Sequence, residues 1–313
     1  VLSGASSTLA IGGTSFNLIR SSSDFSSVTA NGNWALANPV SLTGSRTTSL
    51  INLTFTGQFD GLGNTLANLT FSGVAADAYL AMFKLTNGAT IRNLGLPNYV
   101  STPTSAAAGN GYSTGALIGG VTGGTTTVTQ VWSTGVVEPT ATTAFTGFAG
   151  GGLVGIVNGG GRLELSKSWS SVGLSKGSAT ITNITLGGLV GSNVNSFGQD
   201  NSAGGGSIIL SEVYSTGALS ASNGTWWGIG GLIGLNWASG VVVQITDSFS
   251  WSVITSNFTT WGGLIGQSGG SVPTFTRAYT SSDYCIFTIQ TFTGCTRSVT
   301  PGTTVAGMST GVW

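Results

Sequence analysis

A short glycine-apolar signature occurs five times in the last two thirds of this 313-residue chain. Four copies read Gly-Gly-Leu-Val/Ile-Gly, and the first copy has Ala116 in place of the second glycine. The central leucines, 36, 36, 43 and 32 residues apart, are Leu117, Leu153, Leu189, Leu232 and Leu264. Self-similarity at such a period indicates stacked supersecondary units that bury their apolar faces only against neighbouring units. The spacing therefore predicts a repeat protein.

A second element follows each leucine, an aromatic residue with serine or threonine directly after it. The aromatic residues, found 15, 16, 25, 17 and 15 residues after the leucines, are Trp132, Trp169, Tyr214, Phe249 and Tyr279. The longest spacing contains a polar, glycine-rich stretch over 195–205, which we interpret as a loop insertion of about ten residues. We expect one strand of each unit to end in the signature and a second strand to point its aromatic ring inward, so that the rings form a buried ladder. Core packing is the favoured role of this column, and a platform for a ligand is the alternative.

Local propensities favour strands throughout. Glycine and β-branched residues dominate, and both disfavour helices. The best candidate for a short helical turn runs over 21–28. Parallel units stack about 4.8 Å apart, and glycine permits tight corners between their strands. The sequence thus predicts an all-β chain in which leucine, valine and isoleucine fill the interior as a single domain.

Composition excludes several function classes. Charged residues make up 6% of the chain, with nine basic and nine acidic side chains and no histidine. Because nucleic-acid binding depends on clustered basic residues, we expect no nucleic-acid partner. No apolar run reaches the length of a membrane span, so we expect no membrane insertion. A net charge of zero gives little repulsion between copies, which suits a protein that associates.

Residues 59–70, then 89–96, then the glycine-apolar copies give a more specific indication. The first reads Phe-Asp-Gly-Leu-Gly-Asn-Thr-Leu-Ala-Asn-Leu-Thr and the second reads Ala-Thr-Ile-Arg-Asn-Leu-Gly-Leu. Together they resemble the GLUG-repeat region of bacterial surface proteins, which include filamentous-haemagglutinin-type secreted adhesins. The resemblance covers about residues 15–282. It implies a right-handed parallel β-helix (β-solenoid) at a cell surface, and it names no single activity because the repeat is a scaffold.

We divide the domain into a lead-in or cap (1–50), repeat coils (51–282) and a C-terminal cap or linking segment (283–313). The first residue, Val1, with no basic segment after it, fits a chain whose export signal has been removed. In an exported protein, Cys285 and Cys295 are expected to form a local disulfide. Uncapped ends of a solenoid expose strand edges that pair with other chains, so the terminal segments either cap the stack or join subunits.

Acidic residues give the one hint of an enzyme. Glu164, Glu212 and Asp247 each lie two to five residues before a column aromatic, and a shared groove would suit glycoside hydrolysis, which needs paired carboxylates. Solvated strand ends are the favoured interpretation. The absence of histidine removes the serine–histidine triad and the usual metal-ligand clusters. Asp60 precedes a glycine in what we interpret as a hairpin or coil-corner turn. We therefore predict no catalytic, metal or cofactor site.

Tryptophan residues give the candidate interface. Trp226 and Trp227 are adjacent, so in a strand one of them faces outward, where an aromatic ring can bind a sugar face or a protein. The alternative is that these residues belong to a loop that folds back as a cap. Trp313 ends the chain, and it is expected to dock either on its own body or on a neighbouring chain.

Together these features predict a secreted, non-enzymatic protein of the cell surface. The first hypothesis is a structural or adhesive protein that associates with itself head to tail into a fibre or matrix. The second is a monomeric adhesin module that binds surface glycans or host proteins. The third is a carbohydrate-active β-helix enzyme.

Overall fold

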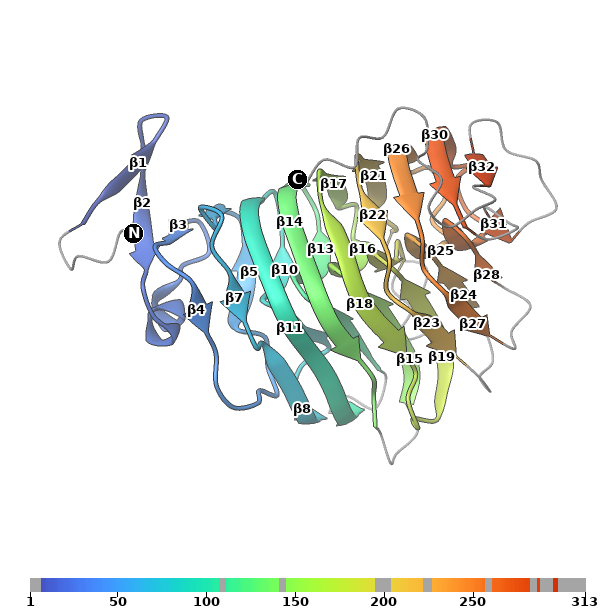
Figure 1. Ribbon diagram of the computed structural model, residues 1–313, viewed down its shortest axis with the longest axis horizontal. Coiled ribbons are helices and arrows are strands. Elements are labelled where there is room, and N and C mark those ends of the chain that lie inside the picture. Colours follow the sequence, from blue (N-terminus) through green and yellow to red (C-terminus); the bar gives the residue numbers. More distant parts are fainter. Residues whose placement is uncertain are drawn as a thin grey trace.

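The computed structural model describes residues 7–106, 111–140, 145–194, 204–221, 227–256, 261–281, 286–287 and 295–297. Regular structure in these ranges is almost all strand, with one short 3-10 helix, η1 (Ser22–Ser27), where the sequence predicted a helical turn. The prediction of an all-β chain is confirmed (Figure 1). No helix in the described ranges has the length and apolarity needed to cross a membrane.

The strands form three main sheets and one pair. The largest sheet contains β1 (Leu9–Ile11), β2 (Thr14–Ile19), β3 (Asn33–Leu36), β6 (Gln58–Asp60), β8 (Thr70–Ala75), β11 (Thr90–Ala106), β14 (Thr125–Val137), β17 (Arg162–Ser166), β18 (Trp169–Ser175), β21 (Ser207–Ser211), β22 (Tyr214–Ser215), β23 (Leu219–Ala221), β26 (Val243–Ser250), β27 (Ile254–Ser256), β30 (Thr274–Thr280) and β32 (Cys295–Arg297).

The second sheet contains β5 (Ile51–Phe55), β10 (Phe83–Thr86), β13 (Ile118–Thr122), β16 (Val154–Asn158), β20 (Val190–Ser192), β25 (Ile233–Asn236), β29 (Ile265–Ser268) and β31 (Ile286–Phe287). The third contains β9 (Tyr79–Leu80), β12 (Tyr112–Gly115), β15 (Phe145–Gly151), β19 (Ile181–Gly187), β24 (Trp227–Gly230) and β28 (Trp261–Gly262). The remaining pair is β4 (Val40–Ser41) with β7 (Leu66–Ala67).

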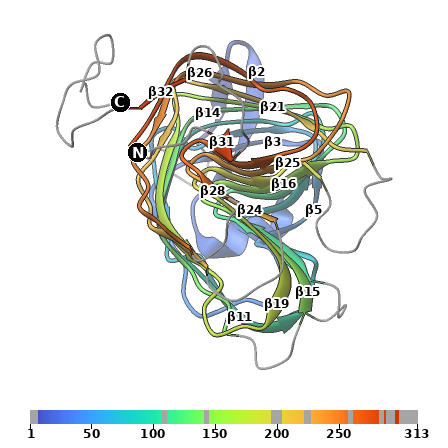
Figure 2. The same ribbon diagram turned by 90° about the vertical axis from the view of Figure 1, so that its right-hand side faces the viewer.

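Strand pairing follows the repeat. Each strand of one unit pairs in parallel with its counterpart in the next unit, as in the run from β13 through β16, β20 and β25 to β29. Among the described strand pairs, only β1 and β2 are antiparallel. Seen along the stack, equivalent strands lie one behind another (Figure 2). The repeat period of the sequence is therefore the period of the backbone hydrogen bonding.

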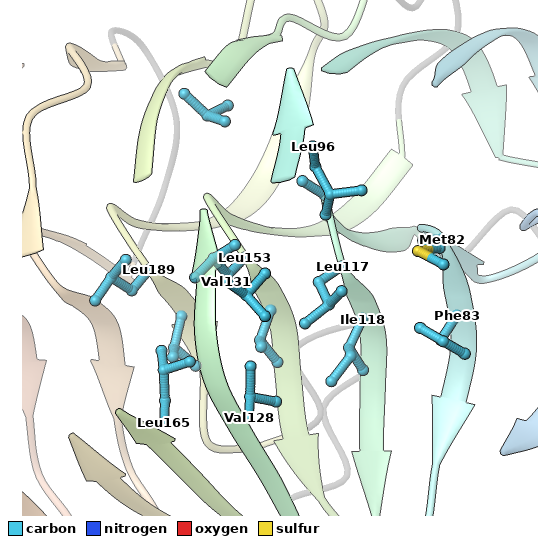
Figure 3. Close-up of a cluster of buried hydrophobic side chains, with 14 of the residues drawn as sticks. Met82, Phe83, Leu96, Leu117, Ile118, Val128, Val131, Leu153, Leu165 and Leu189 are labelled. Carbon is cyan, nitrogen blue, oxygen red and sulfur yellow. The ribbon is translucent and has the colours of Figure 1, made fainter. Parts of the chain in front are cut away.

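The glycine-apolar signature forms a corner between the third and second sheets. Strand β15 ends at Gly151 and β16 begins at Val154, so Leu153 lies at the turn between them. The backbone N–H of Leu153 donates to the carbonyl of Leu189 at 3.0 Å, and the same bond joins each later leucine to the next. All five signature leucines have an exposed fraction of 0%, and three of them line up in the core (Figure 3).

The N-terminal end of the stack is covered. Helix η1 lies at that end (Figure 1), and its Phe25 and the following Val28 are buried in the main core. The hairpin of β1 and β2 extends away from the stack, with β1 as the last strand of the largest sheet. This end therefore does not present an open cross-section of the core.

The Asp60 turn is a corner. Strand β6 pairs with β3 and β11, and the structure gives it no pairing with β7, so the hairpin alternative is wrong. The carboxylate of Asp60, 4% exposed, accepts hydrogen bonds from Leu62 N at 2.8 Å, Asn93 Nδ2 at 3.0 Å and Arg92 Nε at 2.7 Å. These donors hold the corner of one unit against the next.

An outer aromatic ladder and the notch at its end

The five column aromatics lie in register on adjacent strands of the largest sheet. Residue pairing joins each ring-bearing position to the next along β14, β18, β22, β26 and β30. The first four rings are stacked almost parallel, with centroid separations of 5.3, 5.7 and 4.8 Å and interplanar angles of 4–6°. These four rings, from Trp132, Trp169, Tyr214 and Phe249, are called the aromatic ladder below.

The ladder is on the outside of the molecule, so the expectation of an inward ladder was wrong. All five column aromatics are half-buried, whereas the residues on either side of each are buried. Because side chains alternate along a strand, buried neighbours place the ring on the outer face. Partial burial raises the pKa of the Tyr214 hydroxyl.

The glycine corner explains why the serine, not the ring, points inward. Ser133 Oγ donates to the carbonyl of Gly152 at 2.8 Å and lies 3.0 Å from Ser170 Oγ. A Cβ placed on Gly152 would lie 2.2 Å from Ser170 Oγ, so the corner and the serine are already in close contact. The interior at this position has room for a hydroxymethyl group and none for an aromatic ring. The two elements of the repeat are therefore one packing unit.

A column of polar residues runs beside the ladder. Each unit turns a corner through one residue in the left-handed region, with φ between 48° and 56°, and this residue lies two positions before the ring where a ring is present. Such φ values are uncommon outside glycine. The corner residues, in order along the stack, are Asn93, Gln130, Lys167, Glu212, Asp247 and Arg277.

The three acidic candidates do not share one groove. Glu212 and Asp247 occupy successive corners, whereas Glu164 lies within β17 and forms an ion pair with Arg162 at 2.8 Å. Asp247 forms a two-bond ion pair with Arg277 from the next unit, and the hydrogen bonds from this guanidinium lower the pKa of the Asp247 carboxyl. The carboxylates of Glu164 and Asp247 are each paired with an arginine, which suits side chains that hold neighbouring surface residues together. Among the described residues, no three acidic or cysteine side chains lie close enough to hold a metal ion.

The ladder ends in a notch. The position in register with Trp132 on β11 is Gly95, and a Cβ there would lie 2.5 Å from the Trp132 indole. The Trp132 indole therefore lies over Gly95, and a hollow of about 440 Å³ is found beside them. The residues around it are Gly63, Asn93, Leu94, Gly95, Gln130, Val131, Trp132, Lys167 and Trp169, and this hollow is called the notch below.

A second hollow of about 480 Å³ lies at the other end of the same sheet. It is formed by Glu138, Ser175, Lys176, Gly177, Ser220, Ala221, Thr255 and Ser256. It contains no aromatic residue, and its two charged side chains are of opposite sign, so it offers less to a ligand than the notch does.

The tryptophan and cysteine candidates fall largely outside the described residues. Trp226, Trp313 and Cys285 lie outside them. Trp227 and Cys295 are described only as backbone, in β24 and β32. The interface and disulfide interpretations therefore stay predictions.

The sequence reasoning missed Asn93, Gln130 and Lys167 as site residues. The sequence contains a signal for such positions, because later corner residues such as Glu212 and Asp247 stand two positions before a column aromatic. The missing information was that the rings face outward, which makes the corner side chains their neighbours.

Comparison with known proteins supports the fold alone. No protein-family model and no curated protein matches the chain. Among solved structures, the chain is similar to the crystal structure of a "putative immunoglobulin A1 protease" from Bacteroides ovatus, with a TM-score of 0.62 and 19% identity over 91% of this chain and 84% of that one. The class defined so far is an all-β protein of long parallel sheets with an exposed aromatic column. The GLUG resemblance stays a prediction.

Proposed function

We propose that this chain is a right-handed parallel β-helix of the GLUG-repeat type that acts as a non-enzymatic adhesive protein at a cell surface. The observation that carries the proposal is the outer aromatic ladder. Four rings form one continuous apolar strip beside a column of polar and charged corner residues. Aromatic residues bind sugars and proteins through the same apolar surface, and rows of them mark interaction faces.

The charge distribution agrees with adhesion through contact area. With 6% charged residues, the chain has little capacity for long-range electrostatic attraction. Binding would depend on apolar contact and hydrogen bonds along the ladder and its corner column. The repeated corners present one polar side chain beside each ring, so the face combines the two kinds of contact.

Head-to-tail association into a fibre is the second candidate. It draws on the zero net charge and on the general tendency of strand edges to pair. The burial of Phe25 and Val28 under the N-terminal end argues against an end-to-end contact there. We therefore place adhesion first.

An enzymatic role receives the least support. The fold neighbour carries a protease name, but a likeness at 19% identity supports the fold only. The chain has no histidine for a serine–histidine triad, and two of the three candidate carboxylates are paired with arginine. These residues suit a scaffold better than a hydrolase.

The test is binding of the purified chain to arrays of glycans and extracellular proteins. The main variant removes three ladder rings together, Trp169→Ala, Tyr214→Ala and Phe249→Ala. The matched control, Val74→Ser with Val253→Ser, removes exposed apolar side chains elsewhere, since these valines are 52% and 66% exposed. Binding that is lost in the triple variant and kept in the control supports adhesion through the ladder, and equal binding by both contradicts it.

Electron microscopy of the same preparation at several concentrations separates the first two candidates. Rods that stay single at all concentrations support the adhesive monomer. Ordered filaments with an axial repeat near one molecule's length would favour the fibre instead.

A further inference from the structure

We propose that the partner of the aromatic ladder is the ladder of a second copy of this chain, docked about a two-fold axis with the two stacks running in opposite directions. This inference rests on the proposed adhesive function and names its partner, so that adhesion joins like molecules on facing surfaces. The axis runs along the strands and passes midway between the rungs of Trp169 and Tyr214. Three features of this face support the arrangement, which are the ring edges, the charges of the corner column and a column of hydroxyl groups.

The first feature is the row of ring edges. The ladder rings stack on one another, so the flat faces between them are already used within the chain. Each ring is half-buried, and the part left exposed is its outer edge. A two-fold axis at the middle of the ladder places Trp169 opposite the partner's Tyr214 and the first rung opposite the partner's fourth. All four rungs are then matched, and the exposed edges of both copies leave water together.

The second feature is the charge of the corner column. In stack order, its last four members are Lys167, Glu212, Asp247 and Arg277. Asp247 and Arg277 form an ion pair with each other. Lys167 and Glu212 take part in none of the four ion pairs among the described residues. The column therefore offers one basic and one acidic side chain to a partner, and these two stand on neighbouring rungs.

The axis that centres the ladder also centres these two charges. Lys167 stands two residues before Trp169. Glu212 stands two residues before Tyr214, so the midpoint of the charges is the midpoint of the rings. Rotation about an axis along the strands keeps corner column against corner column and reverses the order of the rungs. Lys167 then faces the partner's Glu212, and symmetry repeats this contact. One register satisfies rings and charges together, and such complementarity fixes the orientation of partners.

The third feature is a column of hydroxyl groups, which flanks the corner column on the side away from the ladder. Its members, in register on β14, β17, β21, β26 and β30, are Thr129, Ser166, Ser211, Thr246 and Thr276. None of the five is buried. Ser166 Oγ donates to Thr129 Oγ1 at 3.0 Å, and both oxygens keep capacity to accept. The same rotation places Ser166 opposite the partner's Ser211. Because a hydroxyl both donates and accepts, this column is complementary to itself.

The contact is narrow, because it is limited to the ladder, the corner column and the hydroxyl column. Interfaces well below about 1,200 Å² are weak, and one pair is expected to dissociate with a constant on the order of 0.1 mM. The zero net charge of the chain removes general repulsion between copies. Many copies on each of two surfaces would strengthen the contact through multivalency.

The experiment is a charge exchange in the full chain, measured by sedimentation equilibrium up to about 1 mM protein. The unmodified chain should form dimers in that range. Lys167→Glu and Glu212→Lys should each weaken self-association at least tenfold, because each change places like charges opposite one another twice. The double variant Lys167→Glu with Glu212→Lys should regain the affinity of the unmodified chain. Its net charge is unchanged, so general attraction between charged molecules would not explain the recovery.

Further variants and a surface assay complete the test. Lys176→Glu is the matched control, since it makes the same charge change in the hollow at the other end of the sheet, and it should dimerise normally. Trp169→Ala with Tyr214→Ala removes the two central rings and should abolish dimers. If that variant fails to fold, the charge variants still decide the matter. Beads coated with Lys167→Glu should cluster with beads coated with Glu212→Lys and not among themselves.

The proposal is overturned if the unmodified chain stays monomeric over the whole range, if the single charge variants associate as tightly as the unmodified chain, or if the double variant does not recover. A failure here with retained, ladder-dependent binding on the arrays would leave the adhesive function intact. Charge-dependent dimers that need the central rings, together with no array binding, would support this inference while adhesion to foreign ligands fails.

Discussion

A cluster of buried aromatic rings in the first third of the stack contrasts with the half-buried outer ladder of the later repeats. In the first third, Phe55, Phe59 and Phe83 are buried, with centroid separations of 4.9 and 5.5 Å and interplanar angles of 34° and 82°. In the later repeats, the rings of the ladder are half-buried and almost parallel. Interior rings adopt the tilted contacts that fill an irregular volume, whereas the outer rings follow the register of the strands.

The difference shows what the glycine-apolar corner does. Where it recurs, each unit brings a serine and a glycine backbone into contact, and the interior at that position becomes too narrow for a ring. In the preceding unit, the residue in register with Ser133 is the buried Leu96, so the interior there holds a larger side chain. Phenylalanine is accordingly a core residue at Phe83 and a half-buried surface residue at Phe249.

The largest test of this comparison removes one ring from each region. Phe83→Ala leaves a cavity in the core and should reduce the free energy of unfolding by about 3–5 kcal/mol. Trp169→Ala removes a half-buried ring and its two stacking contacts, so it should cost less than half as much. Urea denaturation of both variants measures the two losses. Equal losses would show that the outer ladder is as important to stability as the core.

A second test concerns the polar corner in the first third. Asp60→Ala leaves Arg92, Asn93 and the Leu62 N–H without their buried acceptor and should cost about 2–3 kcal/mol. Asp247→Ala removes an ion pair that is largely exposed, so little change is expected from it. The same denaturation experiment compares the two variants. A larger loss from the Asp247 change would reverse our ranking of the two corners.

A third test targets the narrow interior of the later repeats. In Gly152→Ala the new methyl group would lie 2.1 Å from the Gly188 carbonyl oxygen, so overpacking should cost about 1–3 kcal/mol. Gly173→Ala is the matched control in β18, because its nearest neighbour would be 3.8 Å away. The control should be neutral or more stable by about 0.4–1 kcal/mol. A stability difference below the error of the measurement would mean that the corner has more room than the contacts indicate.

The smallest effect concerns acid stability at the two ends of the stack. Backbone N–H groups of Arg20 and Ser21 donate to the Asp24 carboxylate at 2.7 and 3.0 Å, and the first of these bonds contributes most to lowering its pKa. Since the folded-state pKa lies below the ordinary value of 3.8, this carboxylate stabilises the fold above that pH. The stability is lost as the pH falls through the folded-state pKa.

We therefore expect Asp24→Asn to reduce the thermal midpoint at pH 7 and to bring the variant and the unmodified chain together at pH 2. Asp247→Asn should show the same sign, and its effect should disappear in 1 M salt, because an exposed ion pair is screened. Thermal scans at the two pH values and two salt concentrations measure both. An Asp24 effect that grows at low pH would contradict the assigned cause.

Much of the fold was readable from the sequence, because the repeat spacing is also the spacing of the parallel hydrogen bonds. The five leucines and the short helix over 22–27 are local patterns, and the structure places them in the core and at the N-terminal end. Whether the ring of Trp132 and the other ladder rings point into or out of the stack could not be predicted from the sequence. Whether a ring or its neighbouring serine points inward depends on the contact between that serine and a glycine about 19 residues away, as in Ser133 with Gly152.

The notch was also beyond the sequence reasoning. It lies beside Gly95, which takes the rung where a ring would stand, and glycine in a strand is ordinarily interpreted as a bulge or a close backbone approach. The amide and lysine side chains around it become neighbours only through the left-handed corners at Asn93, Gln130 and Lys167. These three corner residues are of different types, so no common residue type indicated that each has a positive φ.

Register in this molecule does not depend on the length of chain between rungs. The rings of Trp132, Trp169, Tyr214 and Phe249 are separated by 37, 45 and 35 residues, yet they stack at nearly constant spacing. Loops can therefore lengthen or shorten without shifting the surface that the strands display. For evolution and for engineering alike, this makes each loop a site where new sequence can be inserted while the row of rings keeps its geometry.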